Sequence, residues 1–145
     1  MANAEKTIVI AGAGSIGCYV GGCLALAGRK VVFLARPRIA EALQGGGLRV
    51  TDLDGRDRSI KPVSVTADPA AALANADVVL VTVKNGATED MAALVAAHAG
   101  SDVVVISLQN GVGNVMGKAI IESERPVTVR DDDRSCRRHY GFHVV

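Results

Sequence analysis

The sequence predicts an α/β fold, in which a doubly wound parallel sheet is covered by helices on both faces. Two observations predict it: short β-branched runs alternate with Ala- and Leu-rich stretches, and a glycine-rich turn directly follows the first run. The chain has 145 residues, of which 49% are hydrophobic. That length and apolar content suit one domain with a substantial core.

Four uninterrupted apolar runs predict strands that are buried on both faces, as in parallel sheets. They are TIVIA at 7–11, VVFLA at 31–35, DVVLVTV at 77–83 and DVVVISL at 102–108. Stretches of helical composition separate them at 15–27, 39–44, 69–74 and 88–99. Strands that alternate with helices in this way indicate βαβ crossovers.

Residues 48–65 interrupt this alternation. The segment LRVTDLDGRDRSIKPVSV alternates apolar and polar residues and carries Asp54-Gly55 at its centre. This pattern predicts an antiparallel hairpin followed by a short strand. We expect the insertion to extend the sheet at one edge.

Composition argues against a nucleic-acid partner. The formal net charge is +1 and aromatic residues make up 3% of the chain. A nucleic-acid interface normally needs a strong excess of positive charge, or aromatic side chains on which bases stack. We therefore expect a small-molecule ligand and no nucleic acid.

Residues 7–28 carry no charge, and a run of that length could span a bilayer. The run contains six glycines, and the segment before it has one Lys and one Glu rather than a basic cluster. It is therefore interpreted as a buried strand and helix. We expect no membrane association and a cytoplasmic location.

The three cysteines predict neither a disulfide framework nor a metal site. Cys18 and Cys23 lie five positions apart in a helical stretch, and Cys136 is distant. Small buried thiols in a reducing compartment account for this spacing. No metal is expected.

The composition divides the chain into two parts. Residues 1–124 hold 11 Lys and Arg against 12 Asp and Glu, and are expected to form the domain. Residues 125–145 hold five Arg and three Asp, with a block of charge and no periodicity. This tail predicts an irregular, solvated segment. A basic interaction arm is the alternative interpretation.

The residues Gly12-Ala13-Gly14-Ser15-Ile16-Gly17 match the GxGxxG pattern between a predicted strand and a predicted helix. Gly12 would permit the tight turn, Gly14 would let a pyrophosphate approach the backbone, and Gly17 would let helix and strand pack closely. The helix N-terminus would offer free N–H groups to the phosphates. This motif predicts a dinucleotide-binding turn.

The end of the second predicted strand indicates which dinucleotide binds. An acidic residue there would bind the ribose 2′-hydroxyl of NAD, whereas an arginine would bind the 2′-phosphate of NADP. The strand ends Ala35-Arg36-Pro37-Arg38, without an acid. A permanently charged planar guanidinium suits a phosphate. We therefore predict NADP, with Arg36 on the 2′-phosphate; the alternative is that both arginines are ordinary surface charges.

Polar side chains follow the next two strands of the predicted sheet. Lys84 comes directly after 77–83, and Gln109-Asn110-Gly111 comes directly after 102–108. Ligands in such sheets collect outside the carboxyl ends of the strands. Lys84 and Asn110 are therefore candidates to bind a carbonyl, a hydroxyl, or the ribose and amide of the cofactor.

Together these motifs resemble the ketopantoate reductase (2-dehydropantoate 2-reductase) family. The resemblance covers about residues 7–122 and rests on GAGSIG, the arginine after the second strand, VTVKN and LQNGVGN. It implies a Rossmann-like fold that reduces 2-dehydropantoate to (R)-pantoate with NADPH, towards pantothenate and coenzyme A. It also implies that Gly12–Gly17 and Arg36 bind the cofactor, while Lys84 and Asn110 lie beside its reactive end and the substrate.

The chain departs from the family in one respect. Members of the family continue into an all-helical domain that carries a proton-donating Lys and a functional Glu, and this chain ends at Val145. We therefore expect a truncated or frameshifted form that carries the cofactor-binding part and no catalytic residue. His98, His139 and His143 are assigned no role, because His98 ends a helix and the other two lie in the tail.

Two alternative functions stay open at this point. The chain could be a non-catalytic NADP(H)-binding module, since the substrate domain is missing, or a Rossmann reductase for another 2-oxo acid. Exposed apolar surface where the second domain would dock would favour self-association. Such self-association would give a homo-oligomer.

Overall fold

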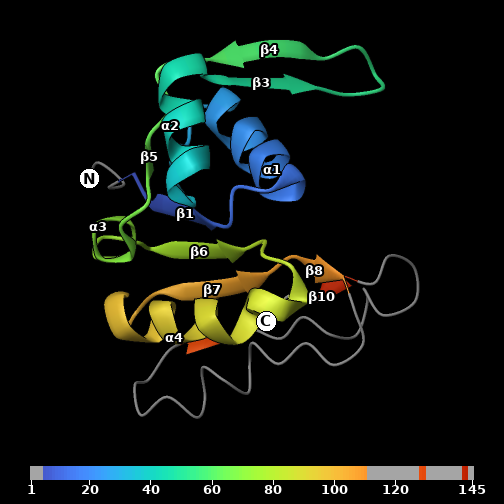
Figure 1. The fold of residues 1–145 in the computed structure, drawn as a ribbon. Helices are drawn as coiled ribbons and strands as arrows, with labels where there is room; N and C mark the ends of the chain where they lie inside the picture. The colour runs from blue at the N-terminus through green and yellow to red at the C-terminus, as the bar shows by residue number, and fades with distance from the viewer. Residues whose placement is uncertain (1–4, 111–127, 130–141, 144–145) are drawn as a thin grey trace.

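The computed structural model describes residues 5–110, 128–129 and 142–143 of the chain (Figure 1). Six strands form one sheet in the order β5-β2-β1-β6-β7-β9, and each neighbouring pair is parallel. These strands are β1 (Thr7–Ala11), β2 (Lys30–Leu34), β5 (Val65–Thr66), β6 (Val78–Val81), β7 (Val104–Ser107) and β9 (Thr128–Val129). The predicted Rossmann-like, doubly wound sheet is confirmed.

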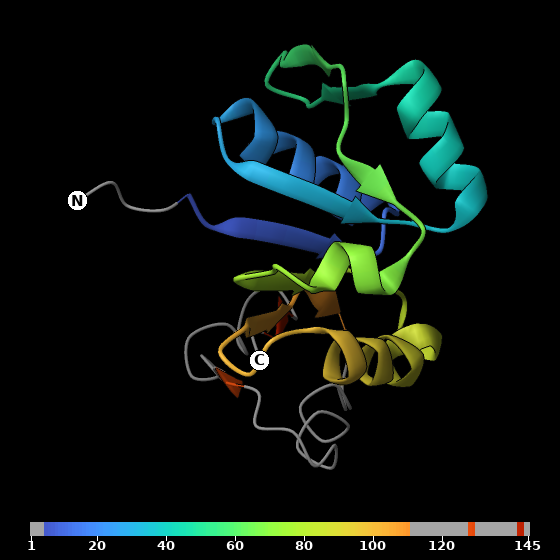
Figure 2. The ribbon, with the colours of Figure 1, turned by 90° about the vertical axis from the view of Figure 1, so that its left-hand side faces the viewer.

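Helices cover both faces of this sheet, as Figure 2 shows. They are α1 (Ser15–Leu26), α2 (Pro37–Gly46), α3 (Pro69–Leu73) and α4 (Thr88–His98), with a 3₁₀ turn, η1 (Asn85–Ala87), before α4. Helices α1 and α2 pack on one face, and α4 packs on the other beside α3. The crossovers that connect parallel strands place them there.

Two hydrophobic cores follow from this arrangement, one on each face. Successive side chains of a strand point to opposite faces, so Val9 and Val79 face α3 and α4. Their neighbours Ile10 and Leu80 face α1, with Phe33 from β2. All of these side chains are at least nine-tenths buried. Uninterrupted apolar strands are therefore what this sheet requires.

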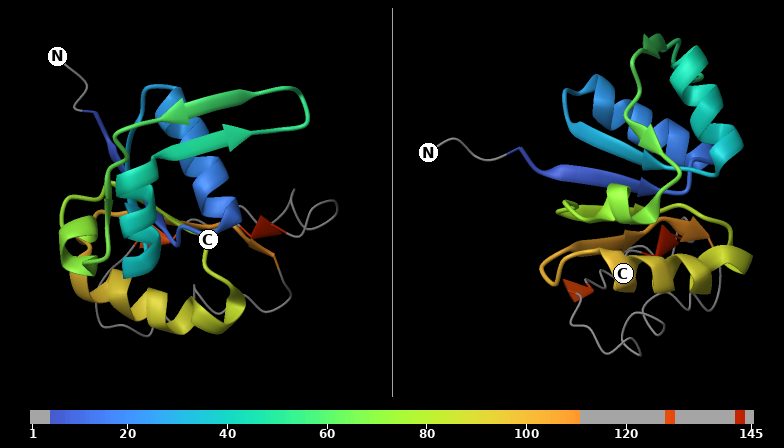
Figure 3. Two further views of the ribbon diagram at one scale, coloured as in Figure 1. Left: turned by 45° about the horizontal axis from the view of Figure 1, so that its top comes forward. Right: turned by 60° about the vertical axis from the view of Figure 1, so that its left-hand side comes forward.

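The hairpin of β3 (Leu48–Thr51) and β4 (Asp57–Ile60) forms a separate two-stranded sheet. It packs across α1 (Figure 3) and does not extend the parallel sheet. Gly22 allows this contact, because a Cβ there would meet the side chain of Val50. The expected edge extension was therefore wrong for the hairpin, and only β5, the short strand after it, joins the sheet edge beside β2.

The bounds of β1 match the prediction, and those of the other predicted sheet strands and helices differ by at most two residues. Helix α2 begins at Pro37 rather than residue 39, because the fixed backbone angle of proline suits the first helical position. Strand β6 is shorter than the predicted run, and residues 82–83 lie beyond its carboxyl end. The proposed domain limit at 124, and most of the tail with Cys136 and His139, lie outside the described residues.

Substitution of Asp68 tests the start of α3. Its side chain caps this helix, because Oδ1 accepts a hydrogen bond of 3.0 Å from the N–H of Ala70. We expect Asp68→Ala to lower the free energy of unfolding by about 1 kcal/mol in urea denaturation. Asp68→Asn retains the accepting oxygen and should lose only a small fraction of this. Equal losses in the two variants would contradict the capping role.

Candidate functional site

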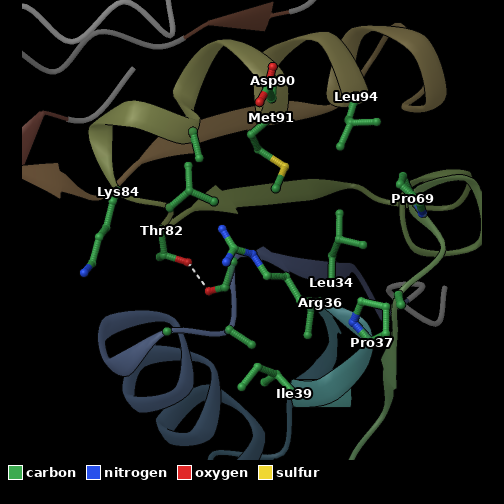
Figure 4. A pocket seen from close by; sticks show the side chains of 17 residues that line it. Leu34, Arg36, Pro37, Ile39, Pro69, Thr82, Lys84, Asp90, Met91 and Leu94 are labelled. Atoms are coloured by element: carbon green, nitrogen blue, oxygen red, sulfur yellow. Dashed lines mark hydrogen bonds between the residues drawn. The ribbon is translucent and has the colours of Figure 1, made fainter. Parts of the chain in front are cut away.

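The direction of winding reverses between β1 and β6. From β1 the chain proceeds outward through β2 to β5, then returns to the other side of β1 and continues through β6 and β7. Such a reversal separates the two crossovers and leaves a crevice at the carboxyl ends of the two central strands. A cavity of about 640 Å³ lies there, as Figure 4 shows.

The turn between β1 and α1 forms one side of this cavity. Gly12, Ala13 and Gly14 line it. Gly12 has a φ of +118°, which glycine adopts readily, and its N–H lies 3.2 Å from the carbonyl oxygens of Ile10 and Leu34. A Cβ on Gly14 would have no atom within 4 Å. The backbone at Gly14 is therefore open to close approach by a ligand.

The other residues of the predicted motif do not line the cavity. Gly17 is buried in the first turn of α1, where a Cβ would fall on the carbonyl oxygen of Gly12 and lie 2.6 Å from Oγ1 of Thr82. Ser15 and Ile16 are exposed at the start of the helix. The first backbone hydrogen bond at this end runs from the N–H of Cys18 to the oxygen of Gly14, at 2.8 Å. The N–H groups of residues 15–17 thus have no acceptor within the helix and suit an anion.

Thr82 holds the glycine turn against the end of β6. Its hydroxyl donates a hydrogen bond of 2.6 Å to the carbonyl oxygen of Gly12 and lies 3.4 Å from that of Ala11. Figure 4 shows this contact at the cavity wall. Thr82 was not among the site residues predicted from the sequence. One sequence signal could have identified Thr82: it lies directly after a buried strand, at the point where the winding of the sheet reverses.

Arg36 enters the cavity from the end of β2. It is the N-cap residue of α2, and its carbonyl oxygen accepts from the N–H groups of Ile39 and Ala40 at 2.9 Å. Its guanidinium extends over the cavity in Figure 4 and forms no ion pair within the described part of the chain. Arg38 does not line the cavity. The one carboxylate among the described lining residues, Asp90, lies across the cavity on α4.

Lys84 lies beyond the end of β6, exposed and at the cavity edge. Among the described residues it has no carboxylate partner. Asn110 belongs to β8 (Gln109–Asn110), whose backbone pairs with β10 (Phe142–His143). The side chain of Asn110 lies outside the described part of the structure. The structure therefore brings Arg36, Lys84 and the glycine turn to one cavity and leaves the Asn110 side chain as a prediction.

Apolar side chains form the remaining walls. Leu34, Pro37 and Ile39 lie on the side of β2 and α2, while Met91 and Leu94 of α4 lie opposite. Figure 4 shows Met91 and Leu94 pointing towards the sheet. The cavity thus combines apolar walls with two cations that form no ion pair among the described residues. This combination suits an aromatic ligand that carries phosphates.

The cysteines and His98 lie away from this chemistry. The Cys18 thiol lies 3.5 Å from the carbonyl oxygen of Ala13, and burial raises its pKa, so it is protonated at neutral pH. Cys23 contacts the Arg56 guanidinium of the hairpin at 2.9 Å. His98 is in the last turn of α4, which suits the negative end of the helix dipole. Within the described residues, no cluster of three or more ligating side chains forms a metal site.

Comparison with known proteins identifies the family. The sequence model of the family described as Ketopantoate reductase PanE/ApbA matches residues 8–123. The chain belongs to this family. The curated 2-dehydropantoate 2-reductase of Archaeoglobus fulgidus is 43% identical to it over 91 residues, which are 63% of this chain and 28% of that protein.

Solved structures agree with this assignment. The PanE/ApbA family ketopantoate reductase from Ralstonia eutropha JMP134 is 38% identical, with a TM-score of 0.71 over 80% of this chain and 37% of that one. A ternary structure of D-mandelate dehydrogenase with NADH and anilino(oxo)acetate has a TM-score of 0.67 over 83% of this chain and 37% of its own. At 24% identity it shares the fold alone.

The chain spans 28% of the curated ketopantoate reductase and 37% of the solved one. The family consists of oxidoreductases, and the region shared with this chain contains the cavity described above. No helix in the described segments has the length and apolar character needed to cross a membrane.

Proposed function

We propose that this chain is the cofactor-binding part of an NADPH-dependent 2-dehydropantoate 2-reductase. One observation carries the proposal: the cavity combines an open glycine turn at a helix N-terminus with an unpaired arginine at the end of β2. Membership of the ketopantoate reductase family supports the reaction. A small 2-oxo acid is then the substrate, pantothenate and coenzyme A biosynthesis the pathway, and the cytoplasm the location.

The glycine turn would bind the pyrophosphate. At Gly14 the space that a Cβ would occupy is open, so an anion can contact the backbone directly. The N–H groups that follow, at Ser15, Ile16 and Gly17, carry the partial positive charge of the helix N-terminus. The backbone N–H groups of this turn therefore fit a diphosphate, and no side chain stands in its way at Gly14.

Arg36 would bind the 2′-phosphate of the adenosine ribose. The guanidinium has no carboxylate partner in the described chain, so its donors are available to a phosphate. A carboxylate that would bind a free 2′-hydroxyl is absent from this position, since β2 ends Phe33-Leu34 and Ala35 follows it. The adenine ring would lie between Pro37 and Ile39 on one side and Met91 on the other.

Lys84 would act at the opposite end of the cofactor from Arg36. When bound, NADPH supplies a hydride to the C2 ketone of the substrate. The Lys84 ammonium would contact the nicotinamide ribose or amide of the cofactor and stabilise the negative charge that develops on the ketone oxygen. The Asn110 amide would donate a hydrogen bond to the substrate or the cofactor. The family resemblance places the proton donor in the helical domain. No residue of this chain is therefore assigned as the general acid.

Titration of the purified chain with NADPH and NADH, followed by nicotinamide fluorescence, tests the proposal. We expect NADPH to bind roughly 10- to 100-fold more tightly, the contribution of hydrogen bonds from a charged group to the 2′-phosphate. If the chain binds neither NADPH nor NADH, the proposed function is refuted. Tighter binding of NADH would refute the cofactor assignment.

A turnover assay separates the alternatives. A non-catalytic module would bind NADPH without oxidising it in the presence of 2-dehydropantoate. A reductase of another 2-oxo acid would oxidise NADPH with a different substrate, and D-mandelate dehydrogenase shows that the fold serves other 2-oxo compounds. A panel of 2-oxo acids with straight, branched and aromatic side chains covers this alternative.

A further inference from the structure

We propose that Gln109 is a positioning residue that holds Lys84 at the cavity. The proposal rests on the function proposed above, because it assigns Lys84 to the nicotinamide end of the cofactor. Gln109 follows β7 and is 5% exposed. It does not line the cavity, so it would act through the segment that carries Lys84.

The carboxamide nitrogen of Gln109 connects both ends of that segment. Nε2 donates one hydrogen bond of 2.7 Å to the carbonyl oxygen of Val83 and a second of 2.7 Å to Oγ1 of Thr88. Val83 directly precedes Lys84, and Thr88 is the first residue of α4. The 3₁₀ turn η1 lies between them and is closed by a bond of 2.8 Å from the N–H of Ala87 to the carbonyl oxygen of Lys84. One side chain thus fixes the whole segment 83–88.

The orientation of this amide is also fixed. The hydroxyl of Ser107 donates a hydrogen bond of 3.0 Å to Oε1 of Gln109, which leaves Nε2 to face Val83 and Thr88. Ser107 is fully buried and Thr88 is 2% exposed. A buried amide whose two N–H groups are both used has no spare donor. Loss of the amide would leave the partly buried Val83 oxygen and the buried Thr88 hydroxyl without this donor.

The contrast with the opposite end of the sheet supports a role at the site. There, the Asp77 carboxylate accepts a hydrogen bond of 2.7 Å from the N–H of Thr7, and neither residue lines the cavity. Gln109 instead acts where β6 and β7 end, and both of its acceptors flank the unpaired cation. Thr82 secures the glycine turn through a separate hydrogen bond to Gly12, against which Val83 also packs. The two acceptors of Gln109 lie on either side of Lys84, so its effect should be largest at the Lys84 end of the cavity and smallest at Arg36.

Gln109→Met tests this, because methionine matches the length of glutamine but cannot donate the two hydrogen bonds. We expect NADPH binding to weaken on the order of tenfold, the effect of losing a well-placed contact from a charged group. Binding of adenosine 2′-phosphate, which would reach only the Arg36 side, should stay within about twofold. Equal losses for both ligands would indicate a general structural defect and overturn the proposal.

A double variant provides the decisive comparison. Lys84→Met alone should also weaken NADPH binding about tenfold, and adding Gln109→Met should cause little further loss, because both act on one contact. Additive losses would overturn the positioning role. Wild-type protein that binds no NADPH would refute the proposed function and this proposal with it.

Two substitutions of Thr88 provide the same test if Gln109→Met fails to fold. Thr88→Val removes the acceptor oxygen at nearly constant volume, and Thr88→Ser retains it. We expect a selective loss of NADPH binding for Thr88→Val and near wild-type binding for Thr88→Ser. The same affinity in both variants would contradict the role of this hydrogen bond.

Discussion

Gly17→Ala is expected to destabilise the protein by about 1–3 kcal/mol and to weaken NADPH binding at least tenfold. The added Cβ falls on the carbonyl oxygen of Gly12 and lies 2.6 Å from Oγ1 of Thr82. The first of these atoms belongs to the backbone and has no rotamer by which to move away. The glycine turn must therefore shift, and the hydrogen bond from Thr82 to Gly12 is strained or broken. Urea unfolding and cofactor titration measure the two effects.

Gly14→Ala separates the two effects of Gly17→Ala. A Cβ at Gly14 has no neighbour within 4 Å, and its φ of −85° is ordinary for alanine. We expect unchanged stability but weaker binding, because the methyl group occupies the space in which a pyrophosphate would contact the backbone. Gly45→Ala is the matched control. Gly45 lies in α2 and does not line the cavity, and a Cβ there would also have no neighbour within 4 Å. Wild-type affinity in Gly14→Ala would contradict the assignment of this turn to the pyrophosphate.

Arg36→Ala should abolish the preference for NADPH. We expect NADPH binding to weaken about 10- to 100-fold, which corresponds to about 1.5–3 kcal/mol for hydrogen bonds to a charged group, while NADH binding stays nearly unchanged. The reason is that Arg36 is the cavity arginine at the end of β2 and has no ion pair in the described structure. Parallel titrations with both cofactors measure the difference.

Arg38→Ala serves as the control for charge. Arg38 lies two positions further along, in the first turn of α2, but does not line the cavity. Removal of this cation alters the net charge by the same amount, so both variants share any long-range electrostatic effect. If Arg38→Ala weakens NADPH binding as much as Arg36→Ala does, the 2′-phosphate assignment is wrong. Equal weakening of NADPH and NADH by Arg36→Ala would lead to the same conclusion.

The fold was predictable because local composition and tertiary environment agree along most of this chain. Strands buried on both faces must be apolar throughout, so TIVIA and VVLV identify β1 and β6 without any knowledge of their partners. The helix after the first strand was predicted from its position directly after the glycine turn. The hairpin was placed wrongly, because alternation specifies an exposed face and a buried face but not what covers the latter. Here α1 covers it, through the absence of a side chain at Gly22.

The candidate site was only partly predictable, for a related reason. Gly12, Gly14, Arg36 and Lys84 belong to local motifs at the ends of strands, and all four line the cavity. Thr82 and Gln109 act through contacts with residues 70 and 26 positions away in the chain, with Gly12 and Val83 respectively. A hydrogen bond between such distant residues has no periodicity or spacing in the sequence. Only the folded sheet brings these groups together.

The sequence by itself thus determined the parallel sheet, the turn that would hold a dinucleotide and the residues at the strand ends. It could do so because β-branched runs, a glycine-rich turn after a strand and an arginine at a strand end are local features of the sequence. The tertiary structure decided that Thr82 secures the turn and that Gln109 holds both ends of the Lys84 segment. These two roles depend on distances between strands that are adjacent in space, and the order of the strands in the sheet sets those distances.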